Sequence, residues 1–143
     1  MASSEKSDYY RRFRAAALRF EIIGGILLAV GIGANFLFHA SLLAVSLIFA
    51  GPGALLLLLG GSSLQPHNLV KSFAQQCIRE PGREMAQGLL DAICANPKTR
   101  MMAGSIRLVE NAIAVYAATG DADQALVQRL REEAQARLVK KVF

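Results

Sequence analysis

The feature that most constrains this chain is a run of 49 residues, from Ile22 to Val70, that contains no Asp, Glu, Lys or Arg. One membrane-spanning helix needs about 20 apolar residues, so this run is long enough for two spans and a short connection. Only 19% of the whole 143-residue sequence is charged, against about 25% in an average soluble domain. The sequence therefore predicts an all-α integral membrane protein with a two-span transmembrane helical hairpin.

The position of the turn in this hairpin is open to two interpretations. A turn at the Gly-Pro-Gly triplet 51–53 would leave 11 residues for the second span, and these rise only about 16 Å, half of a 30 Å hydrocarbon core. A turn near His39 gives spans of about 22–38 and 41–61, and both are long enough. We therefore expect a hairpin over 22–64, preceded by a basic and aromatic interfacial helix over 1–21.

Small residues recur every four positions in both predicted spans. Such stripes let transmembrane helices approach closely and gain dispersion contacts. A hairpin folded between residues 39 and 40 would bring the two stripes together level by level. The predicted packing residues are Gly25, Ala29 and Gly33 in the first span and Ser46, Ala50 and Ala54 in the second.

In this layout Gly51, Pro52 and Gly53 fall inside the second span. Proline has no N–H to donate to the carbonyl of Ile48, so a kink is expected here. The kink has two interpretations: a packing bend around the first helix, or a hinge or seat for a partner helix.

Basic residues predict the orientation. Five lie before the first span and three soon after the second, whereas the connection has none. By the positive-inside rule we expect both termini on the inner side of the membrane. That side is the cytoplasm for a bacterial inner membrane and the matrix for a mitochondrial inner membrane. We expect lipid headgroups as partners and no nucleic acid, because the membrane surface accounts for the net charge of +5. The predicted headgroup ligands are Arg11, Arg12, Arg14 and Arg19, interleaved with aromatic residues.

The N-terminal segment is predicted to be an uncleaved anchor, since bulky residues rather than small ones end the first apolar run. Glu21 lies at the edge of this run. Three roles stay open for it: solvation at the interface, pairing with a basic residue of a partner subunit, and proton transfer. The predicted contacts with a partner subunit are Glu21, Gly24 and Gly31. The two glycines are included because they do not belong to the predicted packing stripe.

Residues 65–143 are predicted to form a small domain of about four amphipathic helices on the inner side of the membrane. Their apolar faces indicate helices at about 67–79, 83–95, 98–119 and 121–138, with Asp121 and Gln124 at capping-box spacing. No strand pattern competes with this interpretation. The apolar and basic segment 138–143 has three open placements: on the membrane, in a groove, or as the end of the last helix.

The sequence carries no arrangement that favours catalysis. Its two histidines, His39 and His67, are separated by mostly helical chain and would lie about 40 Å apart. Cys77 and Cys94 match no metal or redox spacing and are expected to be buried thiols. No cofactor, metal or catalytic residue is predicted.

Three function classes remain. The leading prediction is a non-catalytic accessory or scaffold subunit of a larger membrane complex, with other integral-membrane subunits as hetero-oligomeric partners. The first alternative is a homo-oligomeric hairpin that permeabilises membranes. The second is an adaptor that recruits a soluble protein to the membrane through the helical half.

Overall fold

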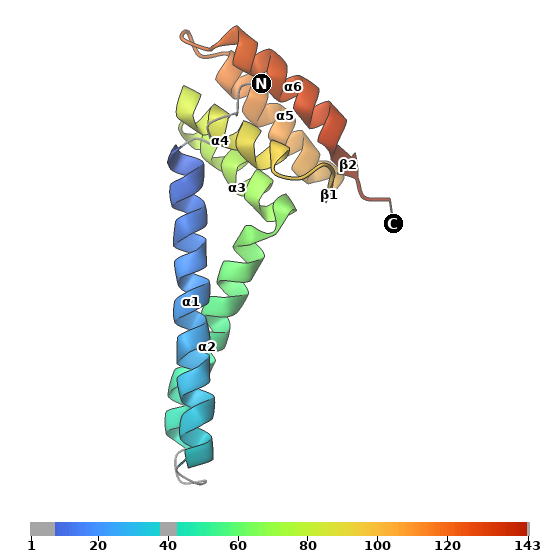
Figure 1. Ribbon diagram of the computed structural model, residues 1–143. Helices are drawn as coiled ribbons and strands as arrows, with labels where there is room; N and C mark the ends of the chain where they lie inside the picture. The colour runs from blue at the N-terminus through green and yellow to red at the C-terminus, as the bar shows by residue number, and fades with distance from the viewer. Residues whose placement is uncertain (1–7, 38–42, 143) are drawn as a thin grey trace. The chain divides into compact units, whose positions relative to one another are not determined.

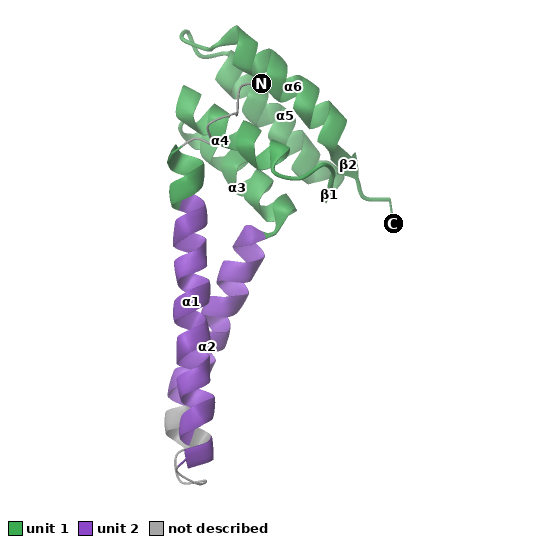
Figure 2. Cartoon of the chain, in the orientation of Figure 1, with its two compact units in different colours: residues 1–12, 65–143 green, residues 13–64 purple. Residues whose placement is uncertain are grey.

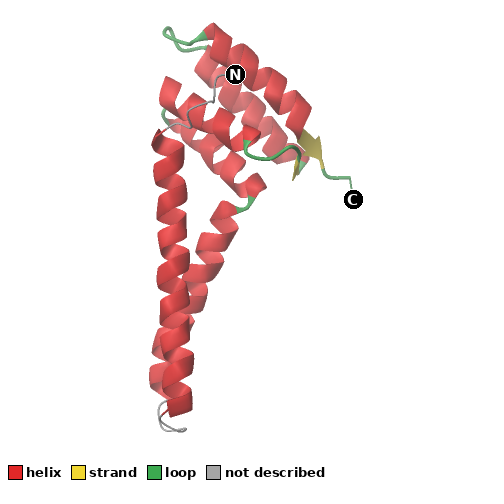
Figure 3. Ribbon diagram, viewed as in Figure 1, coloured by secondary structure: helices red, strands yellow, loops and turns green. Residues whose placement is uncertain are grey.

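The computed structural model describes residues 8–37 and 43–142, with the side chains of Asn35 and of residues 43–46 left undescribed. These parts of the chain hold six α-helices and two short strands (Figures 1 and 3). The helices are α1 (Asp8–Leu37), α2 (Leu43–Leu64), α3 (Pro66–Arg79), α4 (Arg83–Cys94), α5 (Ala103–Ala117) and α6 (Gln124–Arg137). The strands are β1 (Thr99–Met101) and β2 (Leu138–Lys140).

The chain divides into two compact units, shown in different colours in Figure 2. One comprises Phe13–Leu64, which is a helical hairpin. The other comprises Met1–Arg12 and Gln65–Phe143, which is a helical domain. The predicted boundary after residue 21 and the boundary between the two units at residues 12 and 13 both lie within α1.

Both helices of the hairpin are long and apolar enough to cross a membrane by length and composition. The candidate spans are Asp8–Ala34 and Leu47–Leu64, with hydropathies of 1.9 and 1.8. Only 17% and 11% of their most apolar windows are buried. The predicted turn near His39 lies outside the described residues, between α1 and α2.

The helical domain contains the four predicted amphipathic helices. Helix α3 packs against α4 and α5, and α6 packs against α4 and α5 in turn. The apolar stripes predicted for α3 and α4 are buried, and the core also takes Val109, Ile113 and Tyr116 from α5 and Leu126 and Leu130 from α6. Met102, which precedes α5 in extended conformation, is 57% exposed.

Two expectations for this domain are wrong. Residues 99–101 and 138–140 are not helical but pair as a two-stranded parallel sheet. The sequence-based search missed these strands because three residues are too few to show a period of two. The N-cap of the last helix is also different: it is Asp123, two residues later than the predicted Asp121.

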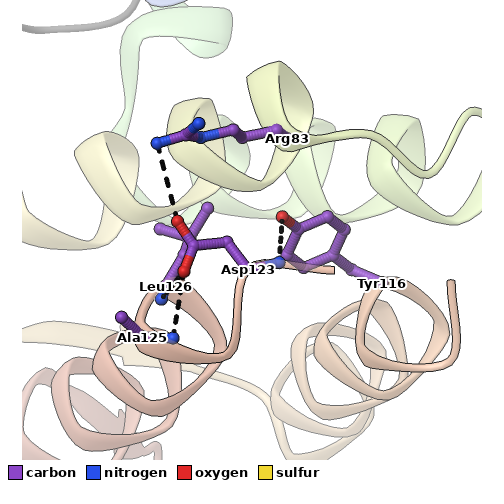
Figure 4. Close-up of polar contacts among 5 residues, drawn as sticks. All are labelled: Arg83, Tyr116, Asp123, Ala125 and Leu126. Carbon is purple, nitrogen blue, oxygen red and sulfur yellow. Dashed lines mark hydrogen bonds and ion pairs between the residues drawn. The ribbon is translucent and has the colours of Figure 1, made fainter. Parts of the chain in front are cut away.

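Asp123 holds three elements of the domain together (Figure 4). Its Oδ1 accepts hydrogen bonds from the backbone N–H groups of Ala125 (3.0 Å) and Leu126 (3.4 Å), which caps α6. Its backbone N–H donates to the Tyr116 hydroxyl at the end of α5 (3.2 Å). Its Oδ2 faces the Arg83 guanidinium at the start of α4, at 3.5 Å. This cluster is structural, since every contact within it fixes a helix end.

Candidate functional site

The hairpin helices touch through glycine at one level. A Cβ atom built on Gly24 would lie 2.8 Å from the carbonyl oxygen of Gly53 and 2.9 Å from the backbone nitrogen of Leu57. A Cβ atom on Gly53 would lie 2.7 Å from the backbone nitrogen of Leu28. Neither position has room for a side chain, so the two backbones are in direct contact.

A second contact level lies seven residues away on each helix. A Cβ atom on Gly60 would lie 3.2 Å from the carbonyl oxygen of Ala17 and 2.7 Å from Cγ of Glu21. The Glu21 carboxylate lies beside the next residue, with Oε1 3.4 Å from a Cβ atom built on Gly61. The Glu21 side chain therefore lies against two consecutive glycines of α2, and a side chain at Gly60 would collide with it.

The contact surface of the hairpin therefore has a seven-residue period. Among the side chains that the structure describes, the buried positions of α1 in this unit are Ala17, Gly24 and Gly31, and those of α2 are Gly53 and Gly60. A spacing of seven residues is two helical turns and keeps a contact on one face of each helix, as in coiled coils. The predicted period of four is not the period of this contact.

The residues of the predicted packing stripe lie away from the closest contacts between the two helices. Gly25 and Gly33 have no atom within 4 Å of a built Cβ, and Ala29 is exposed. Ala50 and Ala54 are half-buried, and the side chain of Ser46 lies outside the described residues. The physical reason is rotation around the helix: four residues advance about 40° beyond one turn at 3.6 residues per turn, so the contact leaves the predicted stripe. Gly24 and Gly31, predicted to face partners, are buried in the hairpin.

The three residues of the Gly-Pro-Gly triplet have different environments. Gly53 faces α1 and permits the closest approach, whereas Gly51 faces open space. Pro52 lies inside α2 and is exposed. The triplet is part of a continuous helix rather than a turn.

The outer surface of the hairpin is covered with large apolar side chains. Among the described side chains, nine on α1 and six on α2 are more than a third exposed. They are Leu18, Phe20, Ile22, Ile23, Ile26, Val30, Ile32, Phe36 and Leu37, with Leu47, Ile48, Phe49, Leu55, Leu58 and Leu59. Large contiguous apolar surfaces mark sites of contact with lipid or with other proteins.

The N-terminal aromatic residues pack inside the helical domain. Tyr10 is 3% exposed and stacks on Phe73, with ring centroids 5.8 Å apart, and Tyr9 meets the same ring edge-on at 5.5 Å. Among the predicted headgroup ligands, Arg11 forms an ion pair with Asp8. Arg12, Arg14 and Arg19 are exposed on α1.

The helical domain has an open groove of about 390 Å³ between α5 and α6. Ile106, Ile113 and Leu138 contribute apolar lining, and Glu110 and Arg131 contribute opposite charges. Neither the groove nor its charged pair was predicted, because both arise from residues far apart in the sequence.

Cys94 lies beside a charged pair that joins α6 to the end of α4. Arg137 forms an ion pair with Glu133 and donates a hydrogen bond to the Asn96 carbonyl oxygen at 3.2 Å. Burial raises the pKa of the Cys94 thiol, and the Glu133 carboxylate raises it further. Burial also raises the pKa of Cys77. Both thiols are therefore held in the protonated, weakly nucleophilic form.

His67 is half-buried in α3, and His39 lies outside the described residues. Within residues 8–37 and 43–142, no group of three or more His, Cys, Asp or Glu side chains is arranged to hold a metal ion.

Comparison of the chain with protein-family models, with curated proteins and with solved structures finds no match.

Proposed function

We propose that this protein is a non-catalytic accessory or scaffold subunit of a larger membrane complex. Its hairpin, 13–64, would lie in the bilayer and bind helices of other subunits. Its helical domain would dock on the inner face of the complex. The observation that carries the proposal is the outer surface of the hairpin, where fifteen large apolar side chains are exposed among the described residues.

A bilayer explains this surface better than water does. Burying a large apolar side chain stabilises a fold by about 1.5–3 kcal/mol, and fifteen such side chains remain exposed on the hairpin. The 30 residues of α1 and the 22 of α2 rise about 45 Å and 33 Å, enough for a 30 Å core. A helix from the core of a soluble protein would be mostly buried, unlike these two.

The charges support an inward placement of both termini. Arg12, Arg14 and Arg19 are exposed before the apolar part of α1, and the segment 38–42 between the helices has no Lys or Arg. Under the positive-inside rule this pattern favours the cytoplasm or the mitochondrial matrix for both ends.

A stripe of small residues offers a place for a partner helix. Gly25, Ala29 and Gly33 recur every four residues and face away from α2. Because the hairpin does not use them, another transmembrane helix could approach α1 there at short distance. This stripe replaces Gly24 and Gly31 as the proposed partner contact.

Native mass spectrometry of the protein extracted from its own membrane in mild detergent tests this function. We expect different subunits in fixed stoichiometry, and an Ala29→Leu variant should lose them. The matched control is Ala16→Leu, the same change at an exposed position of α1 outside the stripe. A monomer in every extract would refute the proposal, and a homo-oligomer alone would shift the assignment to a pore.

A further inference from the structure

The two short strands form a ribbon that brings the end of the chain beside residues 99–101. Arg100 pairs with Val139 and Met101 pairs with Lys140 in parallel register. One more hydrogen bond, from the Lys141 backbone N–H to the Met101 carbonyl oxygen (2.9 Å), extends the pairing. Figure 3 shows the ribbon in yellow beside the C-terminal end of the described chain.

The ribbon has an inner and an outer face. Thr99 and Met101 are 3% and 2% exposed and face the domain core. Arg100 and its partner Val139 lie opposite each other in the pairing and are both exposed. Alternation along a strand places the core-facing and solvent-facing residues of β1 on opposite sides.

A shallow concavity of about 540 Å³ lies on this ribbon. Its lining residues are Arg100, Val139, Lys140, Lys141 and Val142. Three of the five are cations, and none is acidic. The ion pairs found in the described residues use Arg11, Arg83 and Arg137, so none of them neutralises this cluster.

Three cations therefore line one concave surface: Arg100 of β1, Lys140 of β2 and Lys141 directly after β2, with no Asp or Glu among the lining residues. Their mutual repulsion is relieved when an anion binds among them. A guanidinium forms two parallel hydrogen bonds to a phosphate, and lysine ammonium groups add point charges with rotatable donors. Val139 is 39% exposed and Val142 is 92% exposed in the same concavity, so the site also offers contact for carbon atoms.

The geometry points to a binding site for a phosphate ester on the ribbon. Its phosphate lies among Arg100, Lys140 and Lys141, and its apolar part lies against Val139 and Val142. Two sources have this chemistry: the headgroup of an anionic phospholipid and a soluble phosphate ester. The inference is independent of the hairpin's partners, since it rests only on residues of the helical domain.

Native mass spectrometry of the full chain in uncharged detergent tests the site with two probes, phosphatidylglycerol and sn-glycerol 3-phosphate. The test variant is Arg100→Gln/Lys140→Gln/Lys141→Gln. The matched control is Arg79→Gln/Arg107→Gln/Arg129→Gln, which removes the same charge from exposed positions outside the lining. We expect the ribbon variant to bind the preferred probe about tenfold more weakly or worse, because hydrogen bonds to charged groups are lost.

Retention of phosphatidylglycerol alone identifies a membrane lipid as the source, and binding of sn-glycerol 3-phosphate identifies a soluble ester. Both results support the site if the ribbon variant loses binding and the control variant does not. Equal loss in the two variants, or no binding of either probe, overturns the inference. A further variant, Arg100→Lys, keeps the charge and should still weaken binding, which separates phosphate recognition by the guanidinium from unfolding.

Discussion

Adding one methyl group at Gly24 should separate the hairpin helices, whereas adding it at the neighbouring Gly25 should not. The built Cβ atom of Gly24 lies 2.8 Å from the Gly53 carbonyl oxygen, and ordinary contact begins at 3.4 Å. In Gly24→Ala the backbones must therefore move apart by about 0.6 Å, the difference between these distances. A gap of that size forfeits a quarter to a half of the dispersion energy of each affected contact.

The expected magnitude follows from two opposing effects. Overpacking of a tight contact costs about 1–3 kcal/mol, while alanine is favoured over glycine in a helix by about 1 kcal/mol. Gly25→Ala gains the helix preference of alanine without overpacking, because nothing lies within 4 Å of a Cβ atom built on Gly25. The difference between the two variants isolates the contact, and we expect Gly24→Ala to be about 1–3 kcal/mol less stable than Gly25→Ala.

Reversible unfolding of the full chain by SDS in mixed micelles measures this difference. Separation of the helices is followed by energy transfer between two dyes, one at the N-terminal end of the hairpin part of α1 and one at the C-terminal end of α2. The dyes are attached to a variant that lacks the native cysteines. Gly53→Ala and Gly51→Ala form a second matched pair on α2, since Gly53 is in contact and Gly51 is not. If Gly25→Ala or Gly51→Ala destabilised the hairpin as much as its partner variant, the seven-residue contact surface would be wrong.

Three further outcomes are expected in the helical domain. Tyr10→Ala should lower the free energy of unfolding of the domain by about 2–4 kcal/mol, because a buried ring stacked on Phe73 is lost; thermal unfolding of the full chain checks this, and an unchanged midpoint would contradict it. Asp123→Ala should cost about 1 kcal/mol through loss of the α6 cap, while Asp121→Ala should cost almost nothing in the same assay. Glu133→Gln should raise the alkylation rate of Cys94 several-fold near neutral pH, since the carboxylate that raises the pKa of this thiol is removed and Arg137 remains; Glu132→Gln is the control, and equal rates would exclude the electrostatic cause.

The thiols also predict a sign for the dependence of stability on pH. Burial raises the pKa of Cys77 and Cys94 above the ordinary value of 9.0 in the folded protein. A raised folded-state pKa contributes stability that is present below the unfolded pKa and is lost as pH rises through the folded value. The thermal midpoint should therefore fall at alkaline pH, and Cys77→Ala should make that fall smaller.

Long, periodic elements could be predicted from the sequence and short or irregular ones could not. The stripe through Val70, Phe73, Ala74 and Cys77 fixes α3 because a helix must bury such a face. The β ribbon is not visible in this way, since Thr99–Met101 and Leu138–Lys140 pair only after α5 and α6 have brought them together. Its basic concavity was therefore missed, although the Lys-Lys pair at 140–141 and Arg100 were the available signal.

The hairpin shows a different limit of sequence reasoning. Both spans contain enough glycine and alanine for two contact periods, four and seven, and the sequence alone does not rank them. Backbone geometry ranks them, because Gly24 and Gly53 meet at a distance that excludes any side chain. Once the seven-residue set holds the hairpin, the four-residue set at Gly25, Ala29 and Gly33 is left on the outside. Helix α1 thus carries one small-residue face that contacts α2 and a second small-residue face that α2 leaves uncovered; the second face is where we propose that a helix of another subunit binds.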